Sequence, residues 1–508
     1  MNHAFKLVLL FYFLFASYLN TFQTDGTCGQ NDRFSQFDEL VAIGEVNAIV
    51  KPGDAKHFVF FSLIGTTAMY GRAMFYVDGI VSYFPYKIWG LKGQIIATRI
   101  VHTFVLLLSF YLLIIVFVSN SLMRLIASLF LCLMPYTLYF SIVPKPEPYL
   151  LLFVSLFLYF SNLYHHKKSW VFVFLGLALA SKISVLAILP FFAFYFIYIN
   201  KGEWLKKTFW AGFYFVIGLF VGVPALMIGI VKRIYLTSYI EQTFGTVNQA
   251  YDDTNMNAFV WIKYFFAEYF AISIWVLIPL ISIIIYFLFK NHKIKFKLHI
   301  NNFVLISGLF MMVLVFVTTK RLWPHYLYVS LVLLIIGIIS QIKESKYSIY
   351  IGLSFVFLIL PEFMTLYNQS NYLLNREENE LYKETKLNSE LALDYIQNEK
   401  TNTPVAIDLT AYLPNELFVK ACRSQPFSSD IKEGEFRLSH VNNMGESLYS
   451  SNKCIVFNEA NPPTKKVKDN QIETPDQKES LKVFNQFVPS VFSKDSSFGK
   501  IHVYIKIN

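Results

Sequence analysis

The chain is poor in charge and in cysteine. Asp, Glu, Lys and Arg make up only 15% of its 508 residues, against about 25% in an ordinary soluble domain. Its four cysteines are too few for a disulfide framework, and no CxxC pair or His/Cys cluster predicts a zinc site. Walker and Rossmann motifs are missing as well, which argues against a nucleotide-linked substrate. These absences exclude a soluble, disulfide-stapled or zinc-dependent protein.

Long apolar runs are what the chain does have. Apolar residues make up 55% of the sequence, and runs of membrane-spanning length recur until about residue 365. The first run could be a signal peptide, but no small-x-small cleavage site follows it, so we expect a retained helix. We predict an all-α polytopic membrane protein with about eleven helices, at residues 5–21, 94–118, 122–142, 147–163, 169–181, 184–200, 207–231, 266–290, 301–318, 323–341 and 346–365.

The lysines between these runs predict the orientation of the helices. The formal net charge is +10, and alternate loops carry most of the surplus on the face that also holds the N-terminus. The positive-inside rule makes that face cytoplasmic. The opposite face, here called the outer face, then carries loops 22–93 and 232–265 and the tail 367–508. Membrane topology explains the positive charge, so we do not expect nucleic-acid binding.

The stretch FSQFDELVAIGEV (34–46) places two carboxylates side by side just after the first apolar run. A helix here would carry Asp38, Ala42 and Glu45 on one face, with Glu39 about 100° away. A solvated acidic loop, or a charge placed at a helix N-terminus, would also explain the pair. An acid beside a low-dielectric membrane surface can instead serve as a general base.

Several cations are predicted on the same outer face. Arg99 lies inside an apolar segment, where a charge is costly and is by default a functional hypothesis, although it could snorkel to the interface. Other charged candidates could equally be a turn lysine, a helix cap or interface anchors: Lys182, Lys145, Glu147, Lys320, Arg321 and His325. The basic cluster at 320–325 begins a helix, so an external anion would relieve its repulsion with the helix dipole.

Acids and cations gathered on one membrane face suit one kind of reaction. An acceptor hydroxyl needs a base, and a departing phosphate needs positive charge. A long isoprenoid carrier would lie in the bilayer between the helices. The pattern therefore favours group transfer from a lipid-linked phosphate.

Five segments, taken in order, resemble those of the GT-C glycosyltransferases. The resemblance is to the dolichyl-phosphate-mannose protein mannosyltransferase-like and aminoarabinose-transferase-like group. It covers much of residues 5–365 and depends on the order and spacing of the motifs FDELVAIGEV (37–46), YGRAMFYVDGIVSYFPYKIWG (70–90), GQIIATRIVHTF (93–104), KPEPYLLLFVSLFLYF (145–160) and GLALASKISVLAILP (176–190).

The resemblance implies inverting transfer of a sugar from a polyprenyl-phosphate donor to an acceptor hydroxyl on the extracytoplasmic side. By position, Asp38 matches the catalytic base, Glu39 the acid that follows it, and Arg99 the arginine that begins the second helix and would help hold the donor phosphate. Lys182, and with it Arg72, Lys320, Arg321 and His325, would neutralise the donor phosphate. Glu45, Lys145 and Glu147 are left as acceptor contacts or structural residues. Such enzymes need no nucleotide cofactor, and some relatives require a divalent cation.

The chain departs from this group in more than one respect. Relatives often have more helices than the eleven predicted here. No large lumenal β-trefoil insertion of the protein mannosyltransferase type is visible, which puts a protein acceptor in doubt, although protein, lipid and glycan acceptors would all fit the reaction. The absence of this insertion also favours a bacterial inner membrane over that of the endoplasmic reticulum. The predicted topology places the active site and the C-terminus on the extracytoplasmic side.

The composition changes at about residue 367, and we predict a small extracytoplasmic α/β domain over 367–508 after a transmembrane domain over 1–366. Residues 375–400 read as a charged helix, TPVAIDL, KCIVFNE and IHVYIKIN as strands, and 461–480 as a polar loop. Cys422 and Cys454 share this domain and could form a disulfide. The domain could dock the acceptor or cap the membrane core.

Two rival functions come from other classes. A polytopic transporter or lipid flippase would be expected to show internal repeats and broken helices at the membrane midplane. We find no repeat, and the charged candidates gather at one face instead. A non-catalytic scaffold that works through its tail would not need the acids and cations of the outer face.

Overall fold

The computed structural model describes residues 3–27, 37–65, 71–165, 167–227, 300–318, 327–341, 374–399, 405–408, 411–417, 436–439, 454–458 and 492–506, with a few separate residues between 282 and 371. For some residues within helices and strands, Asp38 and Glu39 among them, it describes the backbone alone. The predicted residues Lys320, Arg321 and His325 lie outside the described residues, as does Cys422, so its pairing with Cys454 stays a prediction.

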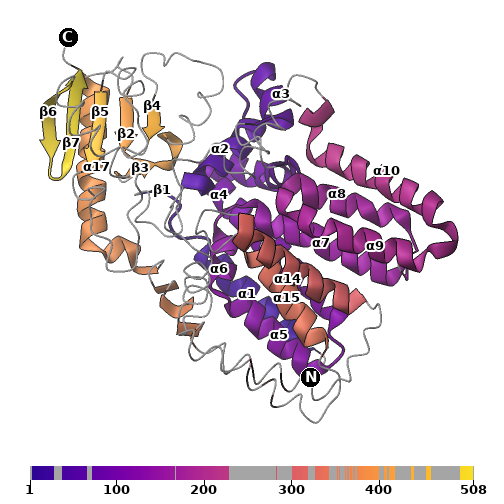
Figure 1. The fold of residues 1–508 in the computed structure, drawn as a ribbon. Helices are drawn as coiled ribbons and strands as arrows, with labels where there is room; N and C mark the ends of the chain where they lie inside the picture. The colour runs from indigo at the N-terminus through magenta and orange to yellow at the C-terminus, as the bar shows by residue number, and fades with distance from the viewer. Residues whose placement is uncertain are drawn as a thin grey trace.

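Most described elements are helices, joined in one helical body (Figure 1). The first half of the chain forms α1 (Ala4–Leu19), α2 (Phe37–Val50), α3 (Ala55–Leu63), α4 (Ala73–Phe117), α5 (Ser121–Leu133), α6 (Pro135–Ile142), α7 (Pro146–Leu163), α8 (Phe172–Ser181), α9 (Leu189–Ile199) and α10 (Trp204–Gly222). Short 3-10 turns stand at Ser169–Val171, Ile183–Ala187, Lys201–Glu203 and Pro224–Met227. Further along are α14 (Ile300–Thr318) and α15 (Tyr328–Ser340).

Helix α4 bends at Gly90, whose φ of 63° and ψ of −151° are not helical. Glycine is the residue that adopts such a backbone without steric cost. We call residues 73–89 the first limb of α4 and residues 91–117 its second limb. The first limb exposes Ile80, Phe84 and Trp89. The bend thus separates residues 73–89 from the spanning helix that the sequence predicted over 94–118.

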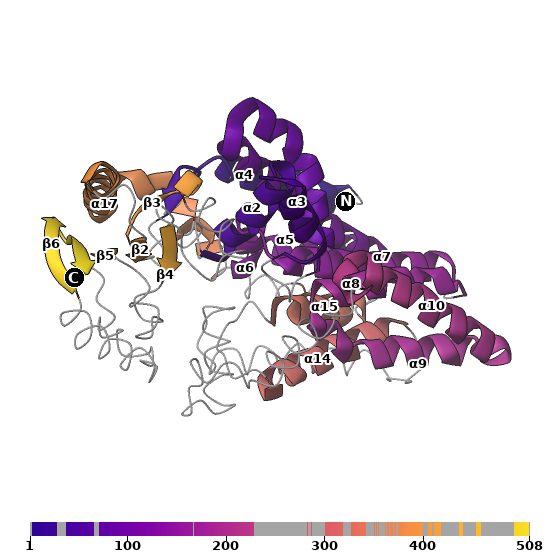
Figure 2. The same cartoon turned by 90° about the horizontal axis from the view of Figure 1, so that it is seen from above.

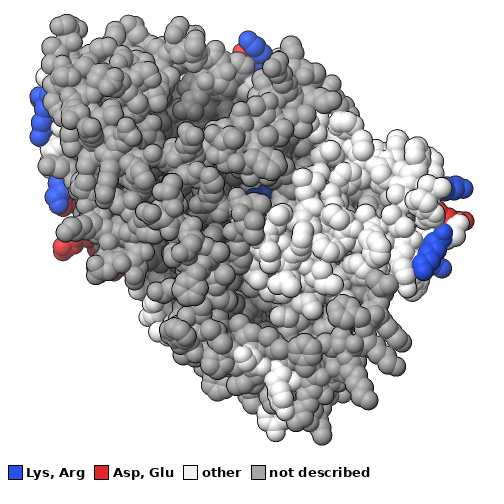
Figure 3. Space-filling model, viewed as in Figure 1, with Lys and Arg blue, Asp and Glu red and all other residues white. Residues whose placement is uncertain are grey.

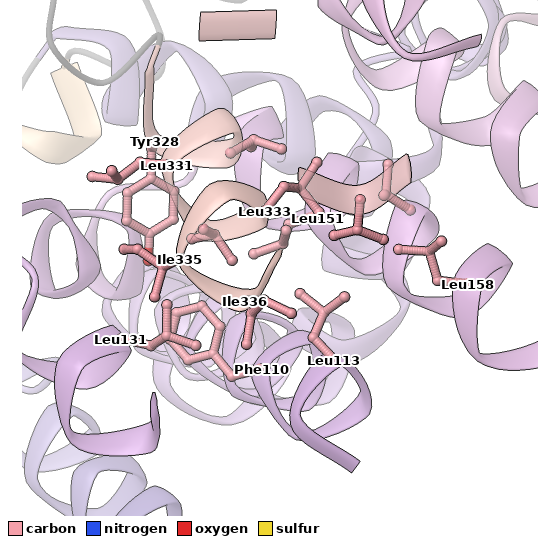
Figure 4. Packing of buried hydrophobic residues seen from close by; sticks show 14 of the residues in the cluster. Phe110, Leu113, Leu131, Leu151, Leu158, Tyr328, Leu331, Leu333, Ile335 and Ile336 are labelled. Carbon is pink, nitrogen blue, oxygen red and sulfur yellow. The ribbon is translucent and has the colours of Figure 1, made fainter. Parts of the chain in front are cut away.

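The helical core is apolar and draws on helices far apart in the sequence. Figure 4 shows Leu333 and Ile336 of α15 near Leu113 of α4 and Leu151 of α7. Elsewhere small residues bring backbones together: a Cβ on Gly218 of α10 would lie 2.0 Å from the carbonyl oxygen of Val173 in α8. Such close approach is typical of helix pairs in membranes, where apolar burial alone does not drive association.

Two described helices are long and apolar enough to cross a membrane, Ala73–Phe117 and Lys201–Gly222. A third crossing would combine Ser121–Leu133 with Tyr136–Ile142, which meet at 66°. Shorter apolar stretches of 10–17 residues also occur in the described helices, and each is shorter than the roughly 20 residues that span a bilayer. The sequence predicted one continuous span over 184–200, but a 3-10 turn and the start of α9 divide it.

A broad uncharged surface covers the right-hand half of the molecule in Figure 3, over α8, α9 and α10. Large apolar side chains of α9 and α10, such as Phe194 and Phe209, are exposed. Charged residues gather at the far right edge (Figure 3). Lys201 and Glu203 are exposed in the turn between α9 and α10, and Lys206 is exposed at the start of α10. A patch of this size on a protein surface marks contact with lipid or another apolar partner.

A small sheet follows the helical body, in the order β4-β2-β5-β7-β6. Strand β2 pairs in parallel with β4 and β5, whereas β5–β7 and β7–β6 are antiparallel. Helix α17 packs on this sheet through Leu393 and Ile396, which join Val405 and Val503 in one core. The bounds are α17 (Glu380–Glu399), β2 (Val405–Asp408), β4 (Phe436–Ser439), β5 (Cys454–Asn458), β6 (Phe492–Phe498) and β7 (Ile501–Lys506). We call α17 and the five strands the C-terminal domain; its helix and three of its strands match those predicted.

Candidate functional site

The first buried ion pair joins α2 to the start of α4. Arg72 donates from Nη1 to Glu45 Oε2 and from Nη2 to the carbonyl oxygen of Phe61. Both charged side chains are almost completely buried, at 1% and 2% exposure. The guanidinium also lies 4.1 Å from the ring centroid of Phe75, in reach of a cation–π interaction. Burial of this kind is tolerated only when the charges are paired and hydrogen-bonded.

Two glycines, Gly65 and Gly71, allow close packing around this pair. Gly65 has a φ of +71°, and a Cβ there would lie 2.2 Å from Arg72 Nη1. Gly71 lies against α8, since its Cβ would be 2.3 Å from the carbonyl oxygen of Ala180. The backbone N–H of Arg72 donates to the carbonyl oxygen of Gly222 at 2.6 Å. Arg72 is therefore fixed where α8 and α10 end.

A second ion pair lies at the same ends. Lys182 follows directly after α8, and its Nζ donates to Glu147 Oε1 at 2.5 Å. Glu147 is in the first turn of α7, where a carboxylate also interacts favourably with the helix dipole. Glu147 is 3% and Lys182 17% exposed. The sequence predicted both residues on the outer face, and the structure pairs them directly.

Three other buried residues form a cluster that joins both limbs of α4 to α7. Asp78, on the first limb of α4, accepts from Tyr149 Oη at 2.6 Å and lies 2.9 Å from His102 Nε2 on the second limb. Asp78 and His102 are both 0% exposed. Tyr149 stands two residues after Glu147, and Asp78 six residues after Arg72. The cluster fixes the angle between the limbs of α4 and holds α7 against them.

The sequence interpretation missed Asp78 and His102. A signal was present: both are ionisable residues in apolar stretches of a chain expected to span the membrane, which marks a functional or paired group. Nothing in the spacing of residues 78, 102 and 149 shows that they meet, because only the bend at Gly90 brings the two limbs together.

Arg99 is buried at 1% exposure, as its position in an apolar helix predicts. Its guanidinium donates to the backbone carbonyl oxygens of Phe22 at 2.7 Å and Gln23 at 3.2 Å, with a longer contact to Asn20 at 3.4 Å. Among the described contacts, Arg99 therefore anchors the chain that leaves α1. A role in holding phosphate stays a prediction.

The remaining predicted residues are placed less completely. Asp38 and Glu39 lie in the first turn of α2, and only their backbone is described. Lys145 is buried at 4% exposure, with Nζ 5.9 Å from the ring centroid of Tyr139. Lys320, Arg321 and His325 lie outside the described residues. Of the predicted residues, the structure thus pairs Glu45 with Arg72 and Glu147 with Lys182.

Two buried polar atoms of the pairs have hydrogen-bonding capacity left. Arg72 Nε and Glu147 Oε2 have no hydrogen-bond partner within the described part of the chain. One is a donor suited to an anion and the other an acceptor suited to a hydroxyl. No group of three or more His, Cys, Asp or Glu that could hold a metal ion occurs among the described residues. The arrangement offers paired charges and spare polar atoms for a polar substrate.

Comparisons with known proteins identify the fold. No protein-family model and no curated protein sequence matches the chain. A solved structure does: ArnT from Cupriavidus metallidurans bound to undecaprenyl phosphate, with a TM-score of 0.53 and 11% sequence identity, over 99% of this chain and 97% of that one. At this identity the likeness establishes architecture alone. The chain has the fold of that ArnT structure, which confirms the GT-C fold expected from the sequence.

Proposed function

We propose that the protein is an inverting glycosyltransferase that moves a sugar from a polyprenyl-phosphate donor to an acceptor hydroxyl. The observation that carries this proposal is that two ion pairs, Glu45–Arg72 and Glu147–Lys182, form at the C-terminal end of α8, with only Lys182 partly exposed. It is supported by a fold shared with ArnT, whose structure contains undecaprenyl phosphate. Within the GT-C class, the order of the sequence motifs favours the mannosyltransferase-like and aminoarabinose-transferase-like group.

The proposed reaction is a single displacement at the anomeric carbon. Asp38 removes the proton of the acceptor hydroxyl while its oxygen attacks that carbon from the side opposite the phosphate. A new C–O bond forms as the bond between the sugar and the phosphate oxygen breaks, and the lipid phosphate leaves with the electron pair. The anomeric configuration is inverted because attack and departure occur on opposite faces.

The ion pairs have distinct roles in this proposal. The leaving phosphate gains one negative charge, and Arg72 can meet it with Nε, while Lys182 can turn from Glu147 toward it. Oε2 of Glu147 accepts a hydrogen bond from the sugar or from the acceptor. Glu45 keeps Arg72 ordered in the absence of donor, which reduces the entropy lost on binding. Arg99 and the cluster at 320–325 are further phosphate contacts on sequence grounds.

The proposed location follows from the donor and the loop charges. A polyprenyl chain is soluble only in the bilayer, so we place the protein as a multi-pass protein of the bacterial inner membrane. The site and the C-terminal domain lie on the extracytoplasmic side, opposite the lysine-rich turn between α9 and α10.

Asp38→Asn tests the proposal directly. The purified full-length protein in lipid nanodiscs is given radiolabelled undecaprenyl-phosphate sugars and cell-envelope extract as acceptor. We expect transfer with the wild type and a loss of at least about 100-fold for Asp38→Asn, the lower range for removal of a general base. Asp54→Asn is the matched control, since Asp54 is exposed and caps α3; its transfer should be unchanged.

Two results would overturn the proposal. Undiminished transfer by Asp38→Asn would remove Asp38 as the base. Solute uptake or lipid flipping in proteoliposomes, with no transfer from any polyprenyl-phosphate sugar, would favour the transporter.

A further inference from the structure

The segment between α1 and α2 is bound from two sides. Arg99 of α4 holds the carbonyl oxygens of Phe22 and Gln23. Directly after them, residues 24–27 contact Lys386 in α17 of the C-terminal domain. They also contact Arg376, just before α17, and residues 412–415, between β2 and β4. In Figures 1 and 2 strand β3 (Leu413–Pro414) lies between α17 and α2. This short segment therefore ties the helical body to the C-terminal domain.

Asp25 is the centre of this connection. Its carboxylate accepts from Arg376 Nη2 at 2.9 Å and from Lys386 Nζ at 2.7 Å, and more weakly from Tyr412 Oη at 3.3 Å. The Arg376 side chain is 1% exposed. Partial burial acts to raise the pKa of Asp25, but the hydrogen bond from Lys386 and the charge of Arg376 outweigh it and lower the pKa. The carboxylate is therefore ionised at neutral pH and keeps both cations paired.

Backbone pairing extends the connection. Strand β1 (Gly26–Thr27) runs antiparallel to β3, with Thr27 opposite Leu413 and Gly26 opposite Pro414. The side chain of Asn415 donates to the carbonyl oxygen of Thr24 at 2.7 Å. Hydrogen bonds of this kind resist sliding as well as separation, because each group has a single partner in register.

A second contact reaches α2 itself. Val41 packs against the apolar core of the C-terminal domain, beside which Leu417 also lies. Val41 is three residues after Asp38 and four before Glu45, so it stands between the proposed base and the acid that pairs with Arg72. Helix α2 is thus held by α4 at one end and by the C-terminal domain near the other.

We propose that the C-terminal domain is a positioning part of the transferase site, which orients helix α2 through Val41 and through the Asp25 ion pairs. The proposal depends on the function proposed above only for its activity readout. It replaces two looser expectations, a domain that docks acceptor and a domain that merely caps the membrane core. Asp25 and Val41 are positioning residues, since neither is placed among the groups that touch the substrate.

The placement of the groups predicts a specific kinetic signature. Lys182 is held by Glu147 of α7. Arg72 is held by the carbonyl oxygens of Phe61 and Gly222 and by Glu45, in the part of α2 that packs on α4. Loosening the N-terminal end of α2 should therefore move the base and leave donor binding intact. We expect a fall in kcat of roughly 10- to 100-fold, the size that about 1 Å of misplacement causes, with the donor KM within about twofold of wild type.

Two variants and their controls test this signature in the full-length protein. Asp25→Asn removes the ion pairs, and Val41→Ala removes the apolar contact; both should lower kcat. Lys386→Arg keeps the charge and Val41→Ile keeps the contact, so both should retain activity. Leu391→Ala is a matched control on α17, because Leu391 is 44% exposed. Wild-type kcat in both Asp25→Asn and Val41→Ala would overturn the proposal.

A disulfide can replace the ion pairs and separate positioning from other roles. Thr27 and Leu413 are directly opposed across an antiparallel pair, a separation that a disulfide can bridge. The test adds Thr27→Cys and Leu413→Cys to the Asp25→Asn variant in a Cys28→Ser background. When the new disulfide is oxidised, kcat should return to the wild-type value. When it is reduced, kcat should fall again to that of Asp25→Asn. An oxidised protein that stays inactive would show that Asp25 acts in another way and would overturn the proposal.

Hydrogen exchange gives a readout that needs no transfer. Amide exchange in residues 41–50 should be faster in Asp25→Asn and in Val41→Ala than in wild type, and normal again in the oxidised double-cysteine protein. Should the wild type transfer no sugar, the proposed function fails while this result still decides the positioning role. Unchanged exchange in both variants would overturn it.

Discussion

Replacing Arg72 by methionine should separate its part in stability from its part in donor binding. The change deprives a carboxylate of 2% exposure, Glu45, of its guanidinium partner. Removing one member of a buried ion pair costs about 3–5 kcal/mol. At about 2.1 cal/mol/K per residue, the unfolding entropy of 508 residues is about 1.1 kcal/mol/K. The apparent melting temperature should therefore fall by about 3–5 °C.

The double variant Arg72→Met with Glu45→Gln removes both charges. Replacing a whole buried pair by neutral groups is close to neutral in stability, so the melting temperature should return to within about 2 °C of wild type. Donor binding should not return, because the charged hydrogen bond to phosphate is still missing. Its loss is worth about 1.5–3 kcal/mol, or a roughly 10- to 150-fold higher Kd for polyprenyl phosphate.

The assay combines melting curves in detergent with equilibrium binding of labelled polyprenyl phosphate. The double variant is its own control for folding, since it restores stability without the arginine. Wild-type affinity in the stable double variant would show that Arg72 only supports the structure. A single variant that melts like the wild type would refute the estimate for the buried pair itself.

Three further predictions follow from the same geometry. Gly65→Ala should lower stability and donor binding together, because a Cβ would lie 2.2 Å from Arg72 Nη1. Gly90→Ala is the control: its φ is +63° and no atom lies within 4 Å of an added Cβ, so it should show the backbone cost without the loss of donor binding. Tyr149→Phe should lower the free energy of unfolding by about 1–3 kcal/mol, because it removes the hydrogen bond to buried Asp78. Tyr83→Phe is the control: Tyr83 is exposed on the same limb as Asp78, so this change should leave the melting temperature unchanged. The pKa of Asp25 is lowered in the folded protein, so its contribution to stability is complete above the unfolded pKa of about 3.9 and is lost as the pH falls through the folded pKa. The melting temperatures of wild type and Asp25→Asn should therefore converge in acid. A constant difference between the two melting temperatures down to pH 2 would contradict this.

Local sequence patterns predicted the elements well. Apolar runs gave the positions of α1, the second limb of α4 and α7, because burial in lipid or in a helical core requires uninterrupted apolar segments whatever the tertiary arrangement. Alternation of β-branched residues gave β2, β5 and β7 for a similar reason. The span expected over 184–200 is interrupted in the structure, where α9 begins at Leu189 with Pro190 in its first turn, because hydropathy does not register such a break.

The candidate site was predicted only in part. Glu147 and Lys182 were placed on one face by topology, and their pairing agrees with that placement. Glu45 and Arg72 were named separately, but the fold alone showed that they pair. Arg99 was chosen for its cost inside an apolar helix, and the described contacts of its guanidinium are carbonyl groups at the end of α1.

The sequence by itself determined which segments are apolar, where charge is unusual and how the loops are oriented, because these properties depend on neighbouring residues and on the solvent that each segment can enter. Only the tertiary structure decided which charges meet. The bend at Gly90 brings Asp78 to His102, and the pairing of Gly26–Thr27 with Leu413–Pro414 brings Asp25 to Arg376 and Lys386. Ion pairs form between groups within about 4 Å, and contacts across 24 or 350 residues of chain follow from packing that no local pattern records.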